Sequence, residues 1–87
     1  MNEQEQLKRI RELAHNIIQS GLQDGTHYDE WQLRNVTELL ARSVVDLTNL
    51  NLGADIDPPT SLKATISKMK MAYNEMDSQQ RKNGSVV

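Results

Sequence analysis

One helical stripe of aliphatic residues between positions 33 and 50 constrains the fold of this chain more than any other feature. Its members recur at three- and four-residue intervals: Leu33, Val36, Leu39, Leu40, Val44, Leu47 and Leu50. At about 100° per residue they share one face of an α-helix, and charged residues such as Glu38 and Arg42 follow the opposite face. An amphipathic helix is stabilised mainly by packing, so this face must be buried against another part of the protein.

Two further segments carry apolar stripes at the same spacing. The first stripe is Leu7, Ile10, Leu13, Ala14, Ile17 and Ile18, and the last is Leu62, Thr65, Ile66, Met69, Ala72, Tyr73 and Met76. These patterns predict helices over about 3–22, 27–50 and 60–77. We expect the first helix to cover one flank of the middle stripe and the third helix to cover the other.

Turn and capping residues separate the three predicted helices. Gln23-Asp24-Gly25 breaks the first pattern, and either Thr26 with Asp29 or Asp29 with Gln32 is a plausible cap for the second helix. In the connection 51–59, Gly53 can adopt the left-handed conformation after a helix end, and Pro58-Pro59 prevents the second helix from continuing. We expect the apolar Leu52 and Ile56 of this connection to tuck under the bundle.

These elements predict an all-α fold, a small three-helix bundle with two long antiparallel helices and a shorter third helix. Phenylalanine is absent from the 87 residues, so the core is expected to be aliphatic. The length suits a single helical domain over 1–77, and the aperiodic segment 78–87 is expected to form a flexible C-terminal tail. Because so short a chain buries a modest core, association with another chain would be a natural supplement to its stability.

Composition narrows the classes of protein to which the chain can belong. Cysteine is absent, which excludes disulfides and thiolate metal sites. No apolar run approaches the roughly 18 residues of a membrane span, and the acidic, polar start 1–6 is unlike a signal peptide. A cytoplasmic protein without membrane contact is therefore expected.

The residues that most often carry catalysis or bind cofactors form no recognisable pattern here. His15 and His27 match no metal-ligand spacing, and a calcium loop counted from Asp55 lacks its required glycine and glutamate. The four glycines are scattered, so no phosphate-binding loop exists, and no serine lies in a nucleophile elbow. We predict no enzyme activity and no catalytic, cofactor-binding or metal-binding residues.

Charge is distributed unevenly along the chain, although the net charge is only −2. Residues 1–57 hold five basic against ten acidic residues, and residues 58–87 hold five against two. The predicted third helix carries a candidate basic face made of Lys63, Lys70 and Arg81. The mostly acidic chain argues against nucleic acid as the main partner, because nucleic-acid binding favours a concentrated positive footprint.

Several apolar side chains of the second helix lie away from its aliphatic stripe. Trp31, Ala41 and Val45 fall on its outer side, and Tyr28 lies just before it. One interpretation makes Trp31 a cap over the end of the bundle, together with Tyr28. The other makes Tyr28, Trp31, Ala41 and Val45 a candidate partner interface, because tryptophan is enriched at binding hot spots.

The sequence favours a non-enzymatic protein–protein interaction module, such as an adaptor, an inhibitor or a regulatory subunit. A homodimer in which the second helices pair is a further expectation. Two alternatives stay open: a nucleic-acid-associated regulator that uses the basic face, and a helical-hairpin structural subunit, secretion-system subunit or chaperone.

Overall fold

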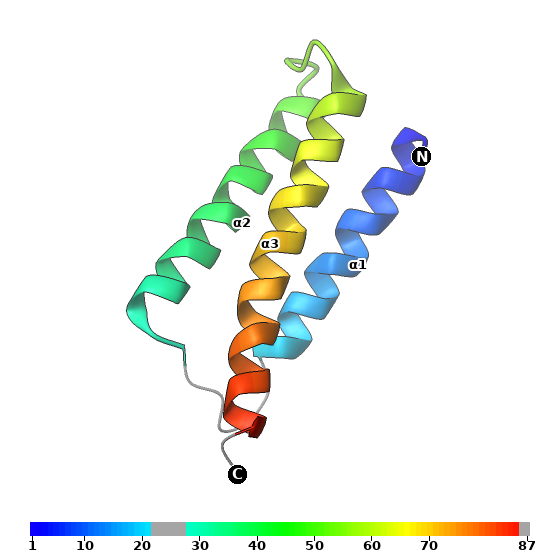
Figure 1. Ribbon diagram of the computed structural model, residues 1–87. Coiled ribbons are helices and arrows are strands. Elements are labelled where there is room, and N and C mark those ends of the chain that lie inside the picture. The colour runs from blue at the N-terminus through cyan, green and yellow to red at the C-terminus, as the bar shows by residue number, and fades with distance from the viewer. Residues whose placement is uncertain (22–27, 86–87) are drawn as a thin grey trace.

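The computed structural model describes residues 1–21 and 28–85, with side chains described as far as Asp77. Three helices and no strand occupy this part of the chain: α1 (Glu3–Gly21), α2 (Glu30–Asn51) and α3 (Pro58–Ser85) (Figure 1). The all-α, three-helix prediction is confirmed.

The start of α2 is fixed by a capping box. The Asp29 carboxylate accepts a hydrogen bond from the Gln32 backbone N–H at 2.7 Å, and the Gln32 side chain accepts one from the Asp29 N–H at 3.2 Å. The predicted Asp29–Gln32 cap is confirmed. Because Asp29 has an extended backbone, α2 begins at Glu30 and not at 27. Thr26, the turn at 23–25 and the predicted helix end at Leu22 lie outside the described residues.

The connection between α2 and α3 follows local backbone chemistry. Gly53 adopts a φ of 71°, as predicted, and its N–H donates to the Leu50 carbonyl at 3.2 Å. These local bonds hold the connection at the end of the bundle, so Leu52 and Ile56 are exposed and the expectation that they tuck under it is wrong. At the start of α3, the Asp57 carboxylate accepts a 2.7 Å hydrogen bond from the Thr60 hydroxyl, and the Asp57 carbonyl accepts one from the Ser61 N–H at 3.1 Å.

α3 extends beyond the predicted 60–77 at both ends and is the longest of the three helices. Pro58 can be its first residue because the first helical N–H needs no partner within the helix. No glycine or proline lies between Thr60 and Asn83, so nothing in the sequence forces an end at Asp77. The predicted flexible tail 78–87 falls on residues whose side chains are not described, and it stays a prediction.

α3 lies between the other two helices, runs parallel to α1 and runs antiparallel to α2 (Figure 1). Its backbone approaches both neighbours closely, whereas no Cα pair between α1 and α2 comes within 8 Å in the described part of the chain. The core joins all three helices through Ile10, Leu13, Ile17, Val36, Leu62, Met69 and Ala72. The expectation that α1 closely covers one flank of the α2 stripe is therefore wrong, because α3 is the helix that has two close neighbours.

Small buried side chains explain the central position of α3. Thr65 and Ala72 of α3 and Ser43 of α2 are fully or almost fully buried, and small residues let helix backbones approach each other. The approach is reinforced by the Asp46 carboxylate of α2, which accepts hydrogen bonds from Lys68 and Thr65 of α3. On the other side, the Gln6 side chain of α1 donates to the Pro59 carbonyl at 3.2 Å.

Candidate functional site

The wide separation of α1 and α2 leaves apolar side chains of both helices uncovered. We call this surface the α1–α2 face and define it by Leu7, Ile18, Leu33, Leu40, Val44 and Leu47. Leu33 is 50 % exposed and Val44 is 62 % exposed, although both belong to the stripe that was expected to be buried. Leu40 and Leu47 are half-buried and connect the face to the core.

The contacts with α3 show which way this face points. On α1, Gln6 marks the side that meets α3, and Leu7 and Ile18 lie about 100° and 120° around the helix from it, beyond the buried stripe. On α2, Asp46 marks the corresponding side, and Val44 lies about 160° from it. The exposed apolar residues of α1 and those of α2 therefore both border the gap between these two helices, on the side of the bundle opposite α3.

The two edges of the α1–α2 face differ in charge. Along α1 the next residues outward are Lys8, Arg11 and His15, all exposed. Along α2 they are the uncharged Thr37, Ala41 and Thr48 together with Glu30, which pairs with Arg34 at 2.8 Å. The face is therefore apolar in the middle and basic along α1, and its edge along α2 carries the Glu30 carboxylate, which is paired with Arg34.

The predicted interface of Tyr28, Trp31, Ala41 and Val45 is only partly a continuous surface. Trp31 is 68 % exposed, so it does not cap the bundle. A charged side chain interrupts the row, because Glu38, which pairs with Arg42 at 2.8 Å, lies between Trp31 and Val45 on the wheel. Tyr28 is half-buried and donates to the Ser20 carbonyl at 3.3 Å. Burial, followed by the negative charge of Asp77, raises the pKa of the Tyr28 phenol above its usual value of 10.0.

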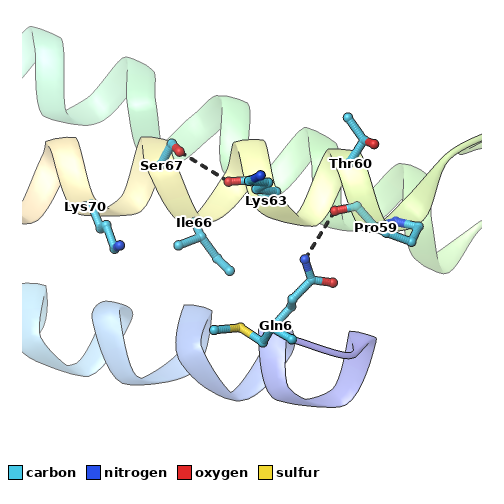
Figure 2. Close-up of a pocket in the computed structure, with 8 residues that line it drawn as sticks. Gln6, Pro59, Thr60, Lys63, Ile66, Ser67 and Lys70 are labelled. Atoms are coloured by element: carbon cyan, nitrogen blue, oxygen red, sulfur yellow. Dashed lines mark hydrogen bonds between the residues drawn. The ribbon is translucent and has the colours of Figure 1, made fainter.

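The predicted basic face borders a groove between α1 and α3. Lys63 and Lys70 line this groove of about 510 Å³, and the Lys70 side chain extends toward α1 (Figure 2). Its other lining residues are Met1, Gln6, Pro59, Thr60, Ile66 and Ser67. The side chain of Arg81 is outside the described residues, so the structure brings together two of the three predicted members.

Gln6 is a buried polar residue in the wall of this groove. Its amide nitrogen is bonded to Pro59, whereas its Oε1 atom is buried without a hydrogen-bond partner in the described structure (Figure 2). A buried acceptor of this kind costs free energy, so the junction between α1 and α3 contains one imperfectly satisfied polar group beside the groove.

Among the described residues, no three His, Asp or Glu side chains come together in a way that could hold a metal ion. Within the same residues, no helix is both long and apolar enough to cross a membrane. Comparison with known proteins gives no match: no family model, no curated protein and no solved structure is significantly similar to this chain.

The α1–α2 face was not predicted, because its residues were assigned to the core. One signal in the sequence could have indicated it. The stripe of α2 spans about 140° from Leu39 to Val44, which is wider than one close neighbouring helix covers. Since α2 has a single close helical neighbour, the outer part of a stripe this wide stays exposed.

Proposed function

We propose that the protein is a non-enzymatic binding module that holds an apolar segment of a partner protein on its α1–α2 face. The observation that carries this proposal is the exposure of Leu33 and Val44 beside the half-buried Leu40 and Leu47. Contiguous apolar surface of this kind is typical of sites that bind other proteins, whereas single exposed apolar residues are common everywhere.

The shape of the face favours a helical segment as the bound element. Leu33 and Leu47 are 14 positions apart along the helix, which corresponds to about 21 Å or four helical turns. A helix laid over the gap between α1 and α2 would pack its apolar side against both rows and complete a four-helix arrangement. Amphipathic helices commonly bind to apolar grooves between helices in this way.

Two neighbouring valines provide a matched test of this proposal. Val44 and Val45 belong to the same helix and are similarly exposed, at 62 % and 57 %, but only Val44 lies on the α1–α2 face. Val44→Glu would place a charge in the proposed interface, whereas Val45→Glu places it on the outer side, near Trp31 and Ala41.

The experiment compares the wild type, Val44→Glu and Val45→Glu in crosslinking and affinity capture from the native cell extract, followed by solution mass measurement of each reconstituted complex. Circular dichroism first establishes that both variants are folded. We expect Val44→Glu to weaken the recovered complex at least tenfold, because a carboxylate buried without a partner is strongly unfavourable. Val45→Glu should bind as the wild type does.

Each other result has a definite meaning. Loss of binding in Val45→Glu alone would move the interface to the surface around Trp31. A partner that binds all three proteins equally, or a wild type that remains monomeric and recovers no partner, would overturn the proposed function. A homodimer disrupted by Val44→Glu would retain the α1–α2 face as the interface and make the partner a second copy.

A further inference from the structure

Building on the proposed function, we infer that the partner segment is an amphipathic helix with an acidic flank, and that this flank lies over Lys8 and Arg11 of α1. The inference concerns the chemistry of the partner, and it depends on charges at the edge of the α1–α2 face that the described chain does not compensate.

Lys8 and Arg11 differ from the other basic residues of α1 and α2. Three of those residues form ion pairs with near neighbours: Arg9 with Glu12, Arg34 with Glu30, and Arg42 with Glu38. Within the described residues, Lys8 and Arg11 have no carboxylate partner. They stand three positions apart, so they follow each other along one edge of the helix.

The basic edge is continuous with the apolar face. Leu7, which belongs to the face, lines a shallow hollow of about 280 Å³ together with Gln4, Lys8 and Arg11. An apolar side chain packed on Leu7 would therefore bring its neighbours on the same helix within reach of both cations. His15, one turn beyond Arg11, continues the same edge.

A second copy of this chain fits these charges poorly. All three carboxylates of α2 are already engaged: Glu30 and Glu38 pair within the helix, and Asp46 pairs with Lys68. On the edge of α2 beside the face, the only carboxylate among the described residues is Glu30, and its pairing with Arg34 leaves no unpaired negative charge there for the basic edge of a second copy. Charge complementarity therefore favours a different, acidic partner over self-association.

The spacing of the two cations specifies the acidic flank. Lys8 and Arg11 are separated by about 4.5 Å along the axis of α1. Two Asp or Glu residues three or four positions apart on the partner helix match this separation, next to an apolar stripe that packs on the α1–α2 face.

Two synthetic helical peptides of about 18 residues test the inference. Both carry the same leucine stripe; one has glutamates along one flank and the other has lysines at the same positions. Dissociation constants are measured by fluorescence anisotropy for the wild type, for Lys8→Glu/Arg11→Glu, and for the control Lys63→Glu/Lys70→Glu. The control changes the net charge by the same amount on the α1–α3 groove, away from the α1–α2 face.

We expect the wild type to bind the glutamate peptide about tenfold more tightly than the lysine peptide. The glutamates form two exposed ion pairs with Lys8 and Arg11, whereas the lysines are repelled by the same two cations. Lys8→Glu/Arg11→Glu should reverse the preference, and the control should keep it. High salt should reduce the preference, because the charges are exposed.

The outcomes separate the inference from the proposed function. Equal binding of both peptides by the wild type would overturn the acidic-flank inference and leave the binding function standing. The same loss of preference in the control would also overturn it, because net charge would then explain the effect. If neither peptide binds, the proposed helix-binding function fails together with the inference.

Discussion

The ionic contact between α2 and α3 offers the sharpest test of how the bundle is held together. Asp46 Oδ2 accepts hydrogen bonds from the Lys68 ammonium at 2.5 Å and from the Thr65 hydroxyl at 3.0 Å. Both charged side chains are about three-quarters buried, since the exposed fractions are 24 % for Asp46 and 28 % for Lys68. The substitution Asp46→Asn keeps the shape and one acceptor oxygen but removes the charge.

The expected cost follows from what remains after this substitution. Hydrogen bonds to charged groups contribute about 1.5–3 kcal/mol and neutral ones about 0.5–1.5 kcal/mol, so removing the charge should cost about 1–1.5 kcal/mol. The cost stays at this level because neither partner is stranded. Thr65 keeps a hydrogen bond to the Ser61 carbonyl at 2.9 Å, and Lys68 can still reach solvent. For a domain of this size the loss corresponds to a fall in Tm of about 4–12 °C.

Urea unfolding followed by circular dichroism measures the difference in the free energy of unfolding, and a thermal melt measures the shift in Tm. The matched control is Glu38→Gln, which removes the charge from the exposed Glu38–Arg42 pair within α2. That change should cost no more than about 0.5 kcal/mol. Equal costs for the two substitutions would refute the idea that the Asp46 contact secures α2 against α3.

Three other substitutions test separate features of the fold. Tyr28→Phe should remove a loss of stability at alkaline pH. Because the pKa of Tyr28 is raised in the folded protein, the unfolded chain loses the phenolic proton first, and folding becomes less favourable as the pH rises through about 10. Urea unfolding between about pH 8 and pH 11 should show a flatter stability profile for the variant, and identical profiles would contradict the assignment. Gly53→Ala should cost about 1 kcal/mol in the same assay, because a φ of 71° is unfavourable for a residue with a side chain. No atom lies within 4 Å of the added methyl group, so a neutral effect would show that the turn itself relaxes. Gln6→Met should stay within about 1 kcal/mol of the wild type, because the lost bond to Pro59 is offset by removal of the unpartnered Oε1; a loss above about 2 kcal/mol would mean that this oxygen has a partner in solution.

Much of the fold follows from local features of the sequence. The apolar periodicities predict three helices, the Asp29–Gln32 box predicts the start of α2, and Gly53 predicts the left-handed turn after it. Each depends on backbone geometry and on residues within one or two helical turns, so no knowledge of distant contacts is needed. Candidate residues were predicted less well: Lys63 and Lys70 do share one groove, but Trp31 neither caps the bundle nor forms an uninterrupted surface with Val45.

The sequence by itself therefore determined which stretches are helical and which side of each helix is apolar. The tertiary structure decided which helix lies in the centre, and with it the exposure of Leu33 and Val44 and the position of Lys8 and Arg11 beside them. The physical reason is that the hydrophobic effect has no direction: an apolar stripe must leave water, but its spacing does not say which neighbour will cover it. That choice depended on how closely the backbones could approach, through small buried residues such as Ser43 and Ala72 on surfaces that meet only in the folded chain.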